Sequence, residues 1–313
     1  MAKRIANVIV DSPIREPLDY LVPADIEIQV GQRCLVPLGT RKVVGIVVGF
    51  SEESRFSKLR EVISRVDDIA PLSFGWLALT SFAARYYQSG WGQVAIPALP
   101  KFFRKLPGKL HERSLERLRK EKKRAVKEPS EKPHLNSEQS AIVEEFQMDG
   151  AFYPALIFGI TGSGKTEVYL HLMEKVLLSD PAAQVLLMVP EINLTPQLVE
   201  RVQSRFPQLE VVSWNSGMAE GQKASSWLAC HEGRARILVG TRLSVFASFK
   251  SLKLILVDEE HDPSFKSQEG VRYNARDLAL KRASIEKIPI VLGSATPSLE
   301  SYKNALEGKF KLF

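Results

Sequence analysis

The second half of the chain alternates short apolar runs with longer stretches of helical character. The apolar runs are Ala155–Phe158, Val185–Val189, Val211–Trp214, Arg236–Val239, Leu254–Val257 and Ile288–Leu292. Near-continuous apolar strands separated by helices are typical of a parallel sheet that is covered on both faces. We therefore predict an α/β domain over residues 135–313, in which ligands bind at the carboxyl ends of the strands.

The first hundred residues have a different pattern. Runs of β type at Ala6–Val10, Arg33–Pro37 and Val43–Val48 alternate with glycines and with prolines, which exclude long helices there. The turn Leu38-Gly39-Thr40 predicts a hairpin between the second and third runs, and Ser73–Gln88 is predicted to be helical. We expect a small, mainly β domain over residues 1–100.

Residues 101–134 form a basic linker between these two parts. They contain 13 Lys/Arg against 5 Asp/Glu, a local net charge of +8 in a chain whose total is +7. A charged helix is predicted over Glu112–Lys127, ended by Pro129 and Pro133. Concentrated positive charge favours a nearby phosphate backbone, but it also fits a solvated linker helix, and both interpretations stay open.

Composition narrows the class of protein. Hydrophobic residues make up 44% of the chain and charged residues 25%, as in ordinary globular proteins, and no apolar run approaches the roughly 20 residues of a membrane span. The two cysteines, Cys34 and Cys230, are far apart and lack Cys-x-x-Cys spacing, which argues against a disulfide framework and against zinc within this chain. We expect a cytoplasmic protein without membrane contact.

A complete phosphate-binding loop pattern follows the run Ala155–Phe158 and precedes a helical stretch. Its glycines let successive backbone N–H groups converge on phosphate oxygens, and the helix that follows adds its positive dipole end. Lys165 should reach the β- and γ-phosphates of ATP, and the Thr166 hydroxyl should coordinate Mg²⁺. The predicted nucleotide contacts are Gly159, Thr161, Gly162, Ser163, Gly164, Lys165 and Thr166.

Two further polar motifs begin where apolar runs stop. Asp258 and Glu259 follow Leu254–Val257, which suits Asp258 to hold Mg²⁺ and Glu259 to orient or deprotonate an attacking water. Ser294 and Thr296 follow another strand, where their hydroxyls can hydrogen-bond the acidic motif and sense its state. The three motifs together predict an ATP-hydrolysing site at one edge of the sheet.

The pairing of Asp258-Glu259-Glu260-His261 with Ser294-Ala295-Thr296 resembles helicase superfamily 2, and the chain as a whole resembles the PriA family of replication-restart DNA helicases (primosomal protein N′). The resemblance covers residues 1–100 and 135–313. The segments that carry it are Leu135–Gln139, Met188–Gln197, Val239–Arg242, Asp258–Lys266, Gln268–Gly270 and Arg272–Asp277. It implies a RecA-like first motor lobe preceded by a mainly β domain that binds DNA 3′ ends.

The resemblance also implies functional roles for individual residues. Gln139 aligns with the residue that meets the adenine of ATP. Phosphate contacts to DNA are implied for Thr195, Gln197, Thr241 and Arg242. Phe265 and Tyr273 could stack on unpaired bases, with Lys266, Arg272 and Arg276 as flanking charges, and the alternative is that the rings pack in the core. Asp19 could accept a hydrogen bond from a 3′-terminal hydroxyl or could simply be a turn residue.

Some features depart from the family pattern. Leu18 stands where the family usually has phenylalanine, which removes a stacking surface. A winged-helix domain usually precedes the motor, but here only the basic linker does. We expect the second motor lobe with its arginine finger, the zinc-binding cysteines and the carboxyl-terminal DNA-binding domain to lie outside this sequence.

The resemblance predicts a 3′-to-5′ DNA helicase that hydrolyses ATP with Mg²⁺ in primosome assembly and fork restart. Its implied partners are forked and single-stranded DNA, primosome proteins and single-stranded DNA-binding protein. The main alternative is a module that binds fork DNA and ATP without motor activity. An RNA-remodelling helicase is a third interpretation, because the phosphate loop and the acidic motif are shared.

Overall fold

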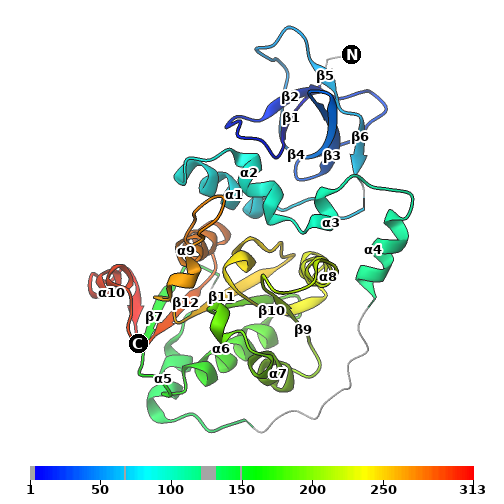
Figure 1. Ribbon diagram of the computed structural model, residues 1–313. Helices are drawn as coiled ribbons and strands as arrows, with labels where there is room; N and C mark the ends of the chain where they lie inside the picture. Colours follow the sequence, from blue (N-terminus) through cyan, green and yellow to red (C-terminus); the bar gives the residue numbers. More distant parts are fainter. Residues whose placement is uncertain (1–3, 67, 121–131, 149) are drawn as a thin grey trace. The chain divides into compact units, whose positions relative to one another are not determined.

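The computed structural model describes residues 4–66, 68–120, 132–148 and 150–313, which divide into two units (Figure 1). The first unit consists of Met1–Lys120 with Ala219–Leu228, and the second consists of Glu121–Met218 with Ala229–Phe313. Residues 121–131 of the expected basic linker, including most of the second half of its expected helix, lie outside the described residues.

The first unit is built on a strongly curved, six-stranded sheet. The strands lie in the order β5-β2-β1-β4-β3-β6, and the pairs are antiparallel except for β2 with β5 (Figure 1). Leu38 pairs with Arg41 and Gly39 has a φ of 61°, so the predicted hairpin is confirmed. The strands are β1 (Ile5–Ile9), β2 (Leu18–Leu21), β3 (Arg33–Leu38), β4 (Arg41–Ser51), β5 (Arg60–Glu61) and β6 (Ser64–Val66).

Four helices follow this sheet: α1 (Phe74–Tyr86), α2 (Trp91–Ala98), α3 (Lys101–Arg104) and α4 (His111–Arg119). Helix α1 confirms the helix predicted in this region, and the Ser73 side chain caps it by accepting from the backbone N–H of Trp76. Helix α2 was not predicted, because Pro97 in its last turn disfavours a helix by local pattern.

The second unit contains seven strands, all parallel, in the order β13-β7-β12-β11-β8-β10-β9. The α/β class is therefore confirmed. The strands are β7 (Pro154–Phe158), β8 (Gln184–Met188), β9 (Glu210–Trp214), β10 (Ala235–Gly240), β11 (Leu252–Asp258), β12 (Ile290–Ser294) and β13 (Lys311–Leu312).

Helices cover both faces of this sheet (Figure 1). Leu254 and Leu256 of β11 belong to a core cluster with α6 and α7, whereas Ile255 and Val257 are buried on the opposite face, on which α9 packs. The helices of the second unit are α5 (Ser137–Glu145), α6 (Lys165–Ser179), α7 (Pro196–Arg205), α9 (Ala275–Glu286) and α10 (Leu299–Leu306). Helix α8 (Glu220–His231) belongs to the first unit as far as Leu228. The 3₁₀ turns are η1 (Glu191–Asn193), η2 (Arg242–Phe246) and η3 (Pro263–Phe265). Across the described ranges, no helix combines the length and the apolar character needed to cross a membrane.

Candidate nucleotide-binding site and DNA-facing loops

The carboxyl ends of the parallel strands bring the predicted motifs to one edge of the sheet. Strand β12 lies between β7, which leads into the phosphate loop, and β11, which ends at Asp258. Gly293 pairs with Asp258 on one side, and Ser294 pairs with Phe158 on the other. The loop of residues 159–166, the acidic motif and the serine-threonine turn are therefore neighbours, although about 130 residues separate the first from the last.

The phosphate loop curls as its glycines require. Gly162 and Gly164 have φ values of 81° and 84°, in the left-handed region that glycine enters without strain. Gly164 is the N-terminal cap of α6, so the loop delivers its backbone N–H groups at the positive end of that helix. The Gly159 N–H donates to the Ser294 carbonyl at 3.1 Å, which ties the loop to β12.

Lys165 lies over the loop that it is expected to serve. Its Nζ donates to the carbonyl oxygens of Gly159 at 2.8 Å and Ile160 at 3.3 Å, and it lies 3.7 Å from Oε1 of Glu259. The side chain is buried. A cation held by two neutral carbonyls and one carboxylate at longer range can transfer to phosphate oxygens, which are stronger acceptors.

Gln139 connects the start of α5 to the phosphate loop. Its Oε1 accepts from the backbone N–H of Asn136 at 2.9 Å in a capping box, and its Nε2 donates to the Ser163 carbonyl at 2.8 Å. A Cβ on Gly164 would lie 2.4 Å from this Nε2, so the glycine leaves room for the amide. The geometry puts Gln139 beside the nucleotide loop, and its contact with adenine stays a prediction.

Asp258 is held by a residue to which the sequence motifs assign no role. The Tyr169 hydroxyl of α6 donates to Asp258 Oδ1 at 3.1 Å, and the tyrosine is buried. A Cβ on Gly293 would lie 1.6 Å from that hydroxyl, so glycine is required at this point of β12. Burial raises the pKa of the Asp258 carboxyl, with the Tyr169 hydrogen bond opposing it. Tyr169 follows Lys165 by four positions, so helical spacing puts both residues on one face of α6.

Glu259 adopts a strained backbone beside the phosphate loop. Its φ of 45° lies in the left-handed region, which costs a residue with a Cβ about 1–3 kcal/mol. The carboxylate lies 3.7 Å from Lys165 Nζ and 3.7 Å from Nδ1 of His261. Strain of this kind concentrates at functional sites, which agrees with the role expected for Glu259.

The serine-threonine turn hydrogen-bonds the acidic motif through His261. The Ser294 hydroxyl lies 2.7 Å from His261 Nδ1, and the Thr296 hydroxyl lies 3.3 Å from Nε2 of the same ring. The Thr296 N–H also donates to the Ser294 hydroxyl at 2.9 Å. The hydrogen bonds that the sequence suggested are present, and a sensing role for them stays a proposal.

Glu260 organises a buried polar cluster that was not predicted. Its carboxylate is 1% exposed and accepts from the Ser298 N–H at 2.6 Å, from the Ser298 hydroxyl at 3.1 Å and from the Ser301 hydroxyl at 2.9 Å. Arg276 Nη1 donates to it at 3.1 Å. Arg276, expected as a charge beside the DNA, is instead buried at the start of α9. Its guanidinium pairs with Glu260 and, at 2.8 Å, with Asp277, so a role for it beside DNA stays a prediction.

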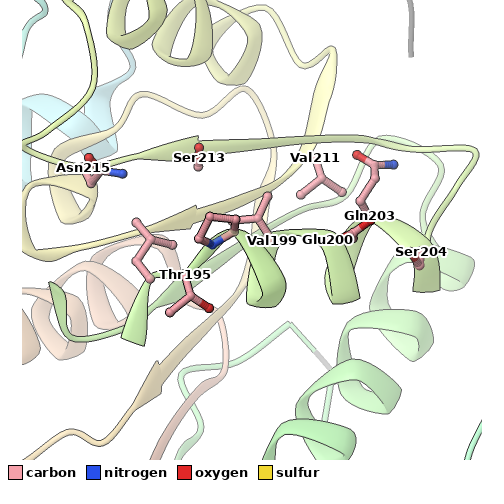
Figure 2. Close-up of a pocket in the computed structure, with 10 residues that line it drawn as sticks. Thr195, Val199, Glu200, Gln203, Ser204, Val211, Ser213 and Asn215 are labelled. Atoms are coloured by element: carbon pink, nitrogen blue, oxygen red, sulfur yellow. The ribbon is translucent and has the colours of Figure 1, made fainter. Parts of the chain in front are cut away.

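The four residues expected to hold DNA phosphates differ in exposure. Thr195 and Gln197 are exposed at the start of α7, where the Thr195 side chain caps the helix by accepting from the Leu198 N–H. Thr241 is buried. Arg242 is half-buried, donates to the Ser264 carbonyl at 3.4 Å and lies 4.0 Å from Glu191. Figure 2 shows Thr195 at one end of a cavity of about 490 Å³ between α7 and β9.

The two aromatic rings expected to stack on bases are packed inside the second unit. Phe265 is 1% exposed and Tyr273 is 8% exposed, and the Tyr273 ring meets Phe246 edge to face at 5.0 Å. Lys266 forms a single β-bridge with Asn274 near them, and Arg272 is exposed. Neither ring offers a face to a base in this conformation, so the structure favours the core-packing alternative.

In the first unit, Asp19 faces a cavity of about 480 Å³ that Trp91 and Arg55 also line. Its carboxylate accepts from Asn7 Nδ2 at 2.9 Å and from the Ser54 hydroxyl at 2.6 Å. Leu18 packs against the core of the sheet instead of standing free as a stacking surface. Asp19 therefore lines a polar cavity, and its carboxylate oxygens can accept further hydrogen bonds.

Neither cysteine is disulfide-bonded, and burial raises the pKa of the Cys34 thiol to about 12. Within the described ranges, His, Cys, Asp and Glu side chains form no group of three or more that could hold a metal ion. A single carboxylate with a hydroxyl, such as Asp258 with Thr166, is the arrangement expected where substrate phosphates complete the shell of Mg²⁺.

Comparison with known proteins identifies the families that the two parts of the chain match. Residues 7–100 match the 3′DNA-binding domain (3′BD) of PriA, and residues 136–305 match the DEAD/DEAH box helicases. The replication restart protein PriA of Rickettsia felis is 35% identical over 309 residues, which span 99% of this chain and 45% of that protein. PriA of Bacillus subtilis is 48% identical over 157 residues, 50% of this chain and 19% of that protein.

Solved structures of helicases match as well. The structure of RecG bound to a three-way DNA junction covers 76% of this chain, and the match spans 29% of that chain, with 20% identity and a TM-score of 0.43. The chain spans less than half the length of the Rickettsia felis relative.

Proposed function

Because the chain belongs to the DEAD/DEAH box helicases and aligns over nearly its whole length with PriA replication restart proteins, we propose that it forms the nucleotide-hydrolysing lobe of an ATP-dependent 3′-to-5′ DNA helicase. ATP hydrolysis drives movement along DNA in primosome assembly and in the restart of stalled forks. The first unit binds the 3′ end of a strand at the fork, with Asp19 accepting from the terminal hydroxyl. Forked and single-stranded DNA, primosome proteins and single-stranded DNA-binding protein are the proposed partners.

One observation carries this proposal: Lys165, Asp258 and Glu259 meet at one sheet edge, with Lys165 Nζ 3.7 Å from Glu259. Asp258 and Glu259 follow Lys165 by more than 90 positions, so only the parallel sheet unites them. A cation above a glycine-rich loop beside two carboxylates is the arrangement that hydrolysis of a nucleoside triphosphate needs.

The roles follow from the geometry. Lys165 exchanges its carbonyl partners for the β- and γ-phosphate oxygens of ATP. Glu259 orients a water for in-line attack on the γ-phosphorus and accepts its proton. The new bond joins the water oxygen to phosphorus, and the bond to the β–γ bridging oxygen breaks to release ADP.

The donor set suits a magnesium ion, because the Thr166 hydroxyl and the Asp258 carboxylate are oxygen ligands. Mg²⁺ held there supplies positive charge that offsets the charge developing on the phosphate oxygens. Tyr169 donates to Asp258 Oδ1, so the other carboxylate oxygen of Asp258 would be available to hold Mg²⁺.

DNA binding affects the ATP-hydrolysing site through the loop that follows the acidic motif. Arg242 donates a hydrogen bond to the backbone carbonyl of Ser264. Ser294 and Thr296 form hydrogen bonds with His261, and Nδ1 of this ring lies 3.7 Å from the Glu259 carboxylate. A DNA phosphate that draws Arg242 away alters the 3₁₀ turn at Ser264. We propose that this rearrangement reports DNA to Glu259.

The test is ATP hydrolysis by this chain with and without a forked DNA that carries a 3′ leading-strand end. Stimulation by the fork is expected. Lys165→Ala should abolish nucleotide binding and turnover, whereas Glu259→Gln should keep nucleotide binding and lose turnover. Equal loss of binding and turnover in Glu259→Gln would make Glu259 structural.

Fork binding without turnover, retained in Lys165→Ala, would favour the alternative of a recognition module without motor activity. A preference for structured RNA over forked DNA would overturn the assignment to replication forks.

A further inference from the structure

The first unit contains a second cavity, of about 590 Å³, between the start of β4, the end of α2 and the segment that begins with α3. Four cations line it: Lys42, Lys101, Arg104 and Lys105. Asp11 is the carboxylate of this lining. The cavity therefore has an excess of positive charge within a domain whose sheet core is apolar.

Arg104 is the most enclosed of these cations. It is half-buried, and its Nε is buried without a hydrogen-bond partner among the described residues. Burial lowers the pKa of the Arg104 guanidinium, and Glu220 and Asp11 oppose that effect. A buried donor without an acceptor is unfavourable, so an anionic oxygen that reached it would be bound with little competition from water.

The carboxylates near the cavity do not neutralise it. Glu220 lies 3.8 Å from Lys101 but is hydrogen-bonded to Lys223 at 3.2 Å, so its charge is shared between two lysines. Val44, Ile96 and Leu106 form an apolar part of the wall, which lowers the local dielectric and strengthens the attraction of the cations for an anion.

We propose that this cavity is a phosphate site that takes a phosphodiester group of the DNA backbone, separate from the cavity around Asp19. The inference rests on the proposed function, in which the first unit binds DNA. A guanidinium flanked by lysines favours a tetrahedral phosphate oxygen set, and such contacts are independent of base sequence.

The two cavities lie toward opposite ends of β4. Lys42 and Val44 line the phosphate cavity, whereas Val48 and Ser51 line the cavity that contains Asp19. At about 3.3 Å per strand residue, the lining residues are separated by about 13–30 Å, or about four to nine nucleotides of one duplex strand. A phosphate in the basic cavity therefore belongs to a nucleotide well inside the duplex or strand, not to the terminal one.

This separation makes the proposal testable through the chemistry of the DNA end. The full chain is titrated with fluorescent forks that end in a 3′-hydroxyl or a 3′-phosphate. Arg104→Gln combined with Lys105→Ala should weaken both forks about tenfold near 100 mM salt and leave their affinity ratio unchanged. The slope of log K against log salt should become less steep by about 0.9 for each DNA phosphate that the variant no longer neutralises.

Lys58→Ala is the matched control, because Lys58 is an exposed lysine of the same unit that does not line this cavity. It should leave the slope as in the parent chain, and thermal unfolding of all variants should be alike. A slope in the double variant equal to that of Lys58→Ala would overturn the proposal. Loss of affinity for the 3′-hydroxyl fork alone would overturn it too, because the cavity would then belong to the 3′-end site.

Inorganic phosphate at constant ionic strength tests whether the cavity binds free phosphate instead of a phosphate group of DNA. Binding of millimolar inorganic phosphate by the parent chain that the double variant abolishes, without any change in fork affinity, would assign the cavity to a free phosphate instead of DNA. If the parent chain showed no preference for a fork with a 3′ end, the proposed function would fail instead. In that case a changed salt slope on plain duplex would still support the phosphate site.

Discussion

Replacing Glu260 by alanine should destabilise the second unit strongly, although the residue is not expected to touch ATP or DNA. The carboxylate is 1% exposed and accepts four hydrogen bonds, two from Ser298, one from Ser301 and one from Arg276. Burial lowers the pKa of Arg276, but Asp277 and Glu260 more than offset this, so the pKa is raised and the guanidinium stays charged. Glu260→Ala removes the buried partner of that charge, leaves it with Asp277, which is about half exposed, and takes the acceptor from the Ser298 and Ser301 donors.

The magnitude follows from the environment of the pair. Removal of one member of a buried ion pair costs about 3–5 kcal/mol, mostly because the remaining charge is desolvated and unpaired. For a unit of this size about 1 kcal/mol corresponds to a shift of roughly 2–4 °C in the thermal midpoint. Glu260→Ala should therefore lower the midpoint of the second unit by roughly 6–20 °C.

Differential scanning calorimetry measures this shift, and Glu300→Ala on the exposed face of α10 is the control for loss of a carboxylate. The double variant Glu260→Ala with Arg276→Met should recover part of the lost stability, because it also removes the guanidinium charge that loses its buried partner in the single variant. A shift in Glu260→Ala no larger than in Glu300→Ala would refute the reasoning. So would additive losses in the double variant, because they would mean that the two side chains stabilise the fold independently.

Three further outcomes are expected. Burial raises the pKa of Asp258, so its ionised form is less stable in the folded protein than in the unfolded chain. Asp258→Asn should raise the thermal midpoint at pH 7, and this gain should shrink as the pH falls through the raised pKa toward the ordinary aspartate pKa of about 3.9. A gain that stayed constant with pH would contradict this reasoning. Gly293→Ala should lower the free energy of unfolding in urea by at least about 1–3 kcal/mol, because its Cβ would lie 1.6 Å from the Tyr169 hydroxyl. Adding Tyr169→Phe should recover part of this loss, and additive losses would contradict the proposed clash. If the Gln139 amide contacts adenine, Gln139→Ala should weaken binding of an ATP analogue about tenfold and hardly affect binding of a GTP analogue. Equal losses for the two analogues would mean that Gln139 only supports the phosphate loop through its hydrogen bond to Ser163.

The sequence by itself determined the class of the second unit and the chemistry at its edge. Near-continuous apolar runs specify buried parallel strands, because only a sheet covered on both faces can accommodate them. A residue that directly follows such a strand must emerge at the carboxyl edge. Lys165 and Asp258 could therefore be assigned to one site before any contact between their segments was known.

What the sequence could not determine is the order of the strands and the partners of individual charges. The placing of β12 between β7 and β11 brings Ser294 to His261 and Gly293 to Tyr169. The strand order arises from long-range pairing, which no local periodicity encodes. Helical spacing puts Tyr169 on the same face as Lys165, but it does not indicate the hydrogen bond from Tyr169 to Asp258.

The tertiary structure also decided which charged and aromatic side chains face solvent. Arg276 and Phe265 belong to segments for which the family resemblance implies a DNA-facing loop, yet Arg276 pairs with Glu260 and Phe265 is 1% exposed. Composition describes what a side chain can bind, whereas burial depends on which elements pack over it. A buried guanidinium is stable when carboxylates pair with it, and the buried carboxylate that pairs with Arg276 is that of Glu260, which follows the end of β11.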